Sequence, residues 1–247
     1  MRKIFSILFI LMCMASTMYA TTYYVSPEGR DYWPGTQSEP WRTIAGSVNR
    51  LTAGDVLIVK DGEYYEEQIS IEVQGTASNP IIIKAENRFG ARIISNSRWH
   101  ILGFTNTAKH VVIDGFDLSH RAEVYPEVGP VKNYNNGKYF GIAIGSNANG
   151  KAEHITIKNM YVHQAAFTGT GMNADHLTVH NCVFADNAHD DDGTGENGSG
   201  LSFSGARHLG DDNAPGYHIY ITNNISFNNW ADEGIFGGKA TDGNGII

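Results

Sequence analysis

Four six-residue segments align without gaps and decide the fold: HVVIDG (110–115), HITIKN (154–159), HLTVHN (176–181) and HIYITN (218–223). Apolar residues alternate in each segment, as Val111 and Ile113 do in the first, so one face of each predicted strand is buried. The starts differ by 44, 22 and 42 residues, which we interpret as two, one and two multiples of a unit of about 21–22 residues. Such a repeat predicts stacked coils in which each strand pairs in parallel with its copies.

Two further features complete one coil. A turn residue follows each segment in one column, namely Gly115, Asn159, Asn181 and Asn223, and these residue types tolerate left-handed backbone. Strands that begin with glycine precede the His-led strands or follow the last of them: GIAIGS from Gly141, GLSFSG from Gly200 and GIFGG from Gly234. We therefore predict an all-β, right-handed parallel β-helix whose coil contains a Gly-led strand, a loop, a His-led strand, an Asn turn and a third strand.

The first residues of the four segments form a histidine column: His110, His154, His176 and His218. Four histidines at the repeat spacing are compatible with a metal site. Coil stacking would instead place equivalent atoms roughly 4.8 Å apart, just before each strand. We favour a structural ladder of stacked rings.

The two ends of the predicted solenoid differ. Residues 43–51 have Ile44, Val48 and Leu51 at helical spacing, and this amphipathic segment is a suitable cap for the first coil. The chain stops at TDGNGII, within a predicted strand and without a cap, so we expect a fragment of a longer protein, with an end-to-end oligomer as the rival. The predicted domain has its cap at about residues 21–60 and its coils at about 61–247.

The first twenty residues have the pattern of an export signal. Arg2 and Lys3 precede an apolar run over residues 4–15, and Ala20 ends a small-residue stretch. The run is too short to span a bilayer well. We expect a secreted bacterial protein, extracellular or periplasmic, whose mature chain begins near Thr21.

Charge and cysteine content restrict the partners. The net charge is −8, and removing the two basic residues of the signal leaves 16 basic and 26 acidic residues, hence −10. This balance argues against nucleic acid and makes a polyanionic ligand dependent on cations. The mature chain contains one cysteine, Cys182, so an internal disulfide is excluded. We expect a monomer.

The amino-terminal third resembles the opening of bacterial secreted β-helix proteins. The matching segments are YYVSPEGRD (23–31), PGT (34–36), EPWRTI (39–44), AGDVLIVKDGEYYE (53–66) and GTASNPIIIKAEN (75–87). Relatives with this opening resemble family 9 polysaccharide lyases, which include pectate lyases. The resemblance implies a polysaccharide substrate, bound along one face beside the first strand of each coil. It also implies a catalytic lysine and a calcium site made of aspartates.

The resemblance directs attention to the loops before the Gly-led strands, over residues 121–138 and 187–198. The second loop reads NAHDDDGTGENG, and crowded carboxylates of this kind suit Ca²⁺ if they are not simply solvated. Our candidate calcium ligands are Asp190, Asp191, Asp192, Asp232 and Glu233. The Asp-Asp-Gly pattern expected beside calcium is only approximated by Asp191-Asp192-Gly193.

Coil stacking would bring WADEGIFGGKATDG (230–243) next to GLSFSGARH (200–208). β-Elimination from a uronate needs a base for the proton α to the carboxylate and a cation for the developing charge. Lys239 is the candidate base and Arg207 a cationic partner. Trp230, Tyr139 and Asp242 are candidate substrate-binding residues.

Two alternatives remain open at this point. A glycoside hydrolase on the same fold would need two carboxyl groups about 6.5–9.5 Å apart, for example Asp191 or Asp192 with Asp232. A non-catalytic carbohydrate-binding surface protein would need neither arrangement.

Overall fold

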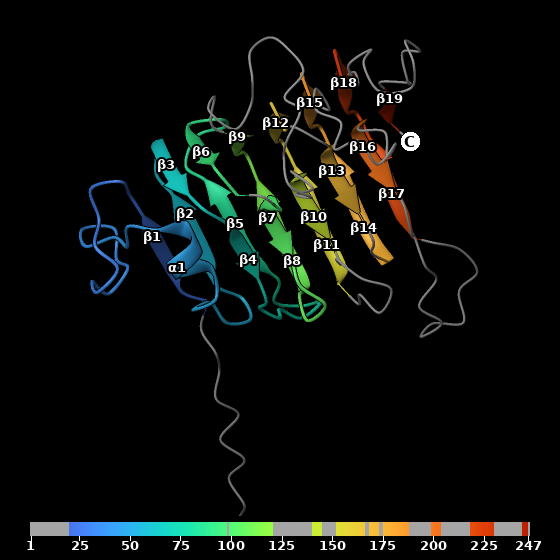
Figure 1. Ribbon diagram of the computed structural model, residues 1–247. Helices are drawn as coiled ribbons and strands as arrows, with labels where there is room; N and C mark the ends of the chain where they lie inside the picture. The colour runs from blue at the N-terminus through green and yellow to red at the C-terminus, as the bar shows by residue number, and fades with distance from the viewer. Residues whose placement is uncertain are drawn as a thin grey trace, which may run out of the picture.

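A computed structural model shows a single solenoid in which strands of successive coils lie side by side (Figure 1). The structure describes residues 20–97, 99–120, 140–144, 152–165, 168–172, 175–187, 199–203, 218–229 and 244–246. These residues form three parallel sheets, which we name A, B and C, and one short helix. The predicted all-β parallel β-helix is confirmed.

The bounds of the strands follow the order of the chain within each sheet. Sheet A contains β1 (Thr22–Val25), β2 (Val56–Val59), β5 (Ile81–Ala85), β8 (Lys109–Asp114), β11 (Glu153–Lys158), β14 (Asp175–His180) and β17 (Ile219–Thr222). Sheet B contains β3 (Gly62–Glu66), β6 (Ala91–Ser95), β9 (Asp117–His120), β12 (Tyr161–His163), β15 (Val183–Ala185) and β18 (Ile225–Phe227). Sheet C contains β4 (Ile69–Ile71), β7 (His100–Phe104), β10 (Phe140–Ile144), β13 (Thr168–Met172), β16 (Ser199–Phe203) and β19 (Asn244–Ile246).

The order of strands in a coil is the predicted one, but the interpretation of the repeat length is wrong. The four His-led strands β8, β11, β14 and β17 are immediate neighbours in sheet A, so no coil is skipped between them. Each step of 44, 22 or 42 residues is one complete coil. The steps differ because the connections differ in length: residues 121–139 join β9 to β10, whereas residues 164–167 join β12 to β13.

Alternating side chains form continuous rows in the interior. Ile155 pairs with Leu177, and Leu177 pairs with Ile219 in the next coil. In sheet B, Val162 pairs with Phe184, and both side chains are fully buried. Cys182 is a buried free thiol beside this core, and burial raises its pKa to about 11. Apolar burial in these rows is the main stabilising term of the solenoid.

An asparagine ladder forms the turn from sheet A to sheet B. Asn159, Asn181 and Asn223 all have positive φ angles, of 54° to 57°. The Asn181 side-chain amide donates to Oδ1 of Asn159 at 2.7 Å, and the Asn159 amide donates to Oδ1 of Asp114 at 2.6 Å. Asparagine is suited to this corner because it tolerates the left-handed backbone and hydrogen-bonds along the stack.

A short helix, α1 (Ile44–Val48), contacts β3 and β4 at the first coils. It is shorter than the predicted residues 43–51, because Thr43 is its N-cap and Asn49 its C-cap. The predicted apolar face is confirmed, since Ile44, Val48 and Leu51 are all buried. Within the described residues, no helix has the length and apolar character needed to cross a bilayer.

Candidate functional site

A groove of about 420 Å³ lies on the outer face of sheet C, over β4, β7 and β10. It is lined by Gln68, Ser70, Glu72, His100, Gly103, Phe104, Thr105, Asn106, Thr107 and Ala143. Residues of β4, β7 and β10 form the floor of the groove. Polar residues that follow β7, namely Thr105, Asn106 and Thr107, form part of its side. Sheet C contains the Gly-led strands β10 and β16, beside which the resemblance implies substrate binding.

The groove is hollow because small residues occupy one register row of sheet C. Ser70 pairs with Gly103, and Gly103 pairs with Ala143. The same row continues through Gly171 to Ser202. Side chains next to the row in the sequence, such as Ile142 and Ile144, point into the core. A row without large side chains allows a ligand to approach the backbone closely.

The imidazole of His100 lies directly over Gly103. A Cβ atom at position 103 would be 2.2 Å from Nε2 of His100, so any larger residue there would displace the ring. Nε2 is buried, and within the described residues it has no hydrogen-bond partner. Burial lowers the pKa of His100 to about 4. At neutral pH the ring is therefore uncharged, with one nitrogen able to donate a hydrogen bond and the other able to accept one.

Hydroxyl and carboxyl groups form the polar side of the groove. The hydroxyls of Thr105 and Thr107 are 2.9 Å apart, and the Thr107 hydroxyl donates to the backbone oxygen of Glu72 at 3.1 Å. The side-chain amide of Gln68 donates to the hydroxyl of Ser70 at 3.0 Å. Groups of this kind bind sugar hydroxyls, and they are held in place by their contacts with one another.

An exposed aromatic residue directly precedes the groove strand β7 in the sequence. Trp99 immediately precedes His100 and is 58% exposed. Its backbone nitrogen donates to the Ser97 hydroxyl at 3.2 Å, and its backbone oxygen accepts from Phe140 of the next coil at 2.8 Å. The indole is thus attached to a fixed backbone while its ring remains open to a ligand.

None of these groove residues is among the sequence-predicted site residues. The available signal was HILGF (100–104), in which a glycine interrupts an apolar strand and a histidine stands three residues before it. The sequence-predicted site residues all lie outside the described residues: Lys239, Arg207, Asp190, Asp191, Asp192, Asp232, Glu233, Trp230, Tyr139 and Asp242.

The histidine column forms the predicted ladder. His110 stacks on His154 with ring centroids 4.3 Å apart, and the next two steps, to His176 and then His218, are both 4.2 Å. All four residues have positive φ angles, of 41° to 55°. Burial and neighbouring histidines lower the pKa of His154, which favours the neutral rings that such stacking needs.

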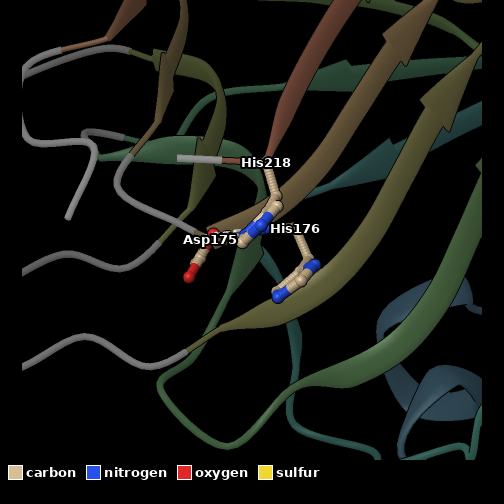
Figure 2. Close-up of side chains that lie close together, drawn as sticks. All are labelled: Asp175, His176 and His218. Atoms are coloured by element: carbon tan, nitrogen blue, oxygen red, sulfur yellow. Dashed lines mark hydrogen bonds and ion pairs between the residues drawn. The ribbon is translucent and has the colours of Figure 1, made fainter. Parts of the chain in front are cut away.

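Asp175 stands at the last step of this ladder. Oδ1 of Asp175 is 3.3 Å from Nδ1 of His218 and accepts the backbone N–H of His176 at 2.8 Å. Figure 2 shows the two imidazoles from neighbouring strands with the carboxylate beside His218. Two nitrogen donors and one carboxylate do not suit Ca²⁺, which takes six to eight oxygen ligands. The described residues therefore provide no support for calcium at this cluster.

Comparisons with known proteins agree with the fold. Residues 23–246 match the family described as "Pel9A-like, right handed beta helix region". The uncharacterized protein YwoF of Bacillus subtilis (strain 168) is 26% identical over 156 residues, which are 61% of this chain and 30% of YwoF. Pectate lyase PEL9 of Emericella nidulans is 37% identical over 67 residues, which are 27% of this chain and 16% of PEL9.

Two solved structures share the architecture. A rhamnogalacturonan lyase matches with a TM-score of 0.62 and 18% identity, covering 86% of this chain and 53% of the lyase. Pectate lyase Pel9A matches with a TM-score of 0.60 and 16% identity, covering 86% and 50%. These neighbours are polysaccharide lyases, although at such identities the likeness establishes the fold alone. The chain spans about half of each of these structures and less than a third of each curated relative. Because the family match extends over nearly the whole described solenoid, this chain belongs to the Pel9A-like right-handed β-helix family.

Proposed function

We propose that this chain is the β-helix of a secreted polysaccharide lyase, which cleaves a uronate-containing polysaccharide such as pectate by calcium-assisted β-elimination. The observation that carries the proposal is the groove over β4, β7 and β10. It lies on the sheet that the resemblance assigns to the substrate, and it combines a floor of small residues with a neutral imidazole. The family and its lyase members favour elimination over other reactions on this fold.

The proposed reaction removes the proton α to the uronate carboxylate and expels the glycosidic oxygen from the β carbon. We assign the base to Lys239 and a stabilising positive charge to Arg207. In the sequence, Arg207 follows β16 and Lys239 precedes β19, and these two strands are neighbours in sheet C. Both residues lie outside the described part of the chain, so their approach to one substrate is part of the proposal.

Calcium has a separate role in the proposal. Bound by Asp190, Asp191, Asp192, Asp232 and Glu233, it would neutralise the substrate carboxylate and lower the energy of the carbanion. The acidic loop that contains three of these residues lies in the chain between β15 and β16. The net charge of −8 would otherwise repel an acidic polymer, so substrate binding should require the cation.

The test is an elimination assay of the full chain with polygalacturonate and with rhamnogalacturonan. A lyase forms an unsaturated uronate, so ultraviolet absorbance should rise, and a calcium chelator should abolish the rise. Lys239→Ala should remove activity, whereas Lys84→Ala on sheet A should retain it. Reducing ends without absorbance would identify a hydrolase, and binding without products would identify a carbohydrate-binding protein; both outcomes reject the proposal.

Export and oligomeric state are part of the same proposal. We infer that residues 1–20 direct secretion and that the mature protein is a monomer. Mass spectrometry of the protein secreted by a bacterial host should find Thr21 at or near the amino terminus, and light scattering should give the mass of one chain. Retention of residues 1–20 on the secreted protein would reject the proposed cleavage.

A further inference from the structure

We propose that Asp175, His176 and His218 form a binding site for a divalent transition-metal ion, for which zinc is the best fit. One ligand atom from each side chain lies within 4.8 Å of the other two. The residues come from two coils, because Asp175 and His176 are in β14 whereas His218 directly precedes β17 (Figure 2). The proposal is independent of the proposed lyase activity.

The separation of Asp175 and His218 fits a shared ion. Oδ1 of Asp175 and Nδ1 of His218 are 3.3 Å apart. In the comparison pair, Oδ1 of Asp117 and Nε2 of His163 form a hydrogen bond of 2.7 Å. Two ligands that bind zinc tetrahedrally with bonds of about 2.0–2.1 Å lie about 3.3 Å from each other. The first pair, which forms a long hydrogen bond in the metal-free protein, thus also has the spacing of two zinc ligands, whereas the second is too close for that.

One coil earlier, the carboxylate that corresponds to Asp175 forms an ion pair with a lysine. Glu153 is in register with Asp175, and His154 stacks on His176. Glu153, however, is paired with the ammonium group of Lys109 at 3.1 Å. The Glu153 carboxylate is therefore already neutralised by an ammonium group at that step. The proposed site is therefore confined to one step of the histidine ladder.

The third ligand requires one local change. The rings of His176 and His218 are stacked at 4.2 Å with an interplanar angle of 7°, so their nitrogen lone pairs lie in nearly parallel planes and do not converge on one point between the rings. A rotation of His176 about its Cβ–Cγ bond would turn one nitrogen toward the ion without moving the backbone, and it would break the stacking of this ring on His154 and His218. The backbone N–H of His176, which donates to Oδ1 of Asp175, would keep the carboxylate in place.

The donor set and its surroundings select the metal. Two imidazoles and one carboxylate suit zinc and related ions, leaving a fourth position for water, whereas Ca²⁺ and Mg²⁺ prefer oxygen ligands. The side chains of Asp175 and His218 are 5% and 19% exposed, so the site is shielded but open to an ion. A bound ion would link β14 to β17 and stabilise the two coils against separation.

The test is calorimetric titration of the metal-free full chain with Zn²⁺ at pH 7.5. We expect one specific site and an increase in the melting temperature on saturation. Asp175→Asn and His218→Asn should each weaken binding at least tenfold. Glu153→Gln and His163→Asn, which alter the two comparison pairs, should retain wild-type affinity. Equal affinity in wild type and both site variants would overturn the proposal and identify adventitious binding to other histidines.

A second measurement does not depend on the folding of any variant. Wild-type protein titrated with Co²⁺ should develop the visible d–d bands of a tetrahedral nitrogen and oxygen site, and Zn²⁺ should displace them. The weak spectrum of octahedral hexaaqua Co²⁺ would contradict the assignment. Saturation of the same site by Ca²⁺ at similar concentrations would contradict it as well.

Discussion

The turn from sheet A to sheet B is nearly identical in successive coils, whereas the connection from sheet B to sheet C is different in each. From β8 onward, the first turn always has two residues: 115–116, 159–160, 181–182 and 223–224. The second connection comprises residues 121–139, 164–167, 186–198 and 228–243 in successive coils. Both belong to the same solenoid, and only the short turn keeps a constant length from coil to coil.

The constant turn belongs to the part of the molecule that determines the fold. The connections of variable length belong to the part whose sequence and length can vary. The short turn repeats its left-handed asparagines and its hydrogen bonds, so it fixes the register of two sheets. The variable connections lead into sheet C, and the groove lies on that sheet. Insertions there leave the interior rows unchanged, because loop length costs little once the strands are paired.

The largest expected effect on stability comes from removing a side chain from the interior rows, which are continuous whatever the length of the connections. Phe184 is fully buried, and Phe184→Ala should lower the free energy of unfolding by about 3–5 kcal/mol, through lost burial and the cavity left behind. Tyr220→Ala, at a side chain that is 60% exposed, should change it by about 0.5 kcal/mol or less. Urea denaturation monitored by circular dichroism measures both. Equal losses would show that the row is not continuous.

The next effect concerns the groove and is a pH dependence. Burial lowers the pKa of His100 from 6.5 to about 4. Between pH 6.5 and pH 4, His100 is therefore protonated in the unfolded chain but neutral in the folded chain. The free energy of unfolding should fall as the pH decreases from about 6.5 to 4, and His100 should contribute on the order of 2–3 kcal/mol to that fall.

The matched variant is His100→Asn, which cannot titrate. Denaturation of the wild type and the variant at several values between pH 7 and pH 4 should show a shallower decline for the variant. Because other histidines titrate equally in both proteins, the difference between the two curves isolates His100. Parallel curves would mean that the imidazole is not held neutral over Gly103.

A smaller effect is expected at the short turn itself. Asn181→Ala loses the hydrogen bond to Asn159 and places alanine at a φ angle of 54°. The combined cost should be about 1–3 kcal/mol of unfolding free energy. Asn181→Gly loses only the hydrogen bond and should cost about 1 kcal/mol. The same destabilisation in both variants would mean that left-handed backbone contributes nothing at this corner.

The smallest effect concerns ligand binding beside the groove. Trp99→Ala should weaken binding of an oligouronide about fivefold, because stacking on a sugar would bury indole surface worth about 1 kcal/mol. The unfolding free energy should hardly change, since the ring is exposed. Tyr32→Ala in the amino-terminal cap removes an aromatic ring that is 75% exposed and should leave affinity unaltered. Calorimetric titration compares the variants, and unaltered affinity for Trp99→Ala would exclude the indole from the site.

The fold could be predicted from sequence because its determinants recur. Ile155, Leu177 and Ile219 each directly follow the histidine that begins their own segment. Asn159 and Asn181 each come five residues after that histidine. The repeat length was misinterpreted because spacing alone does not distinguish an omitted coil from a long connection. Only strand pairing shows that β8 and β11 are neighbours.

The groove and the metal site depend on contacts that no local pattern contains. The position of the His100 ring over Gly103 is a side-chain contact that the spacing of the two residues does not specify. Asp175 and His218 are 43 residues apart, and their separation of 3.3 Å arises only after two coils stack. Sequence reasoning found the ladder to which His218 belongs but gave no role to Asp175.

We propose that an acidic polysaccharide binds on the outer face of sheet C, and a crystal structure of the full chain with a bound oligogalacturonate would locate this binding. Continuous density for the sugar should cross β4, β7 and β10, with a ring close to Trp99 and a hydroxyl within hydrogen-bond distance of His100. Sugar bound on sheet A or sheet B, with the groove empty, would contradict the account.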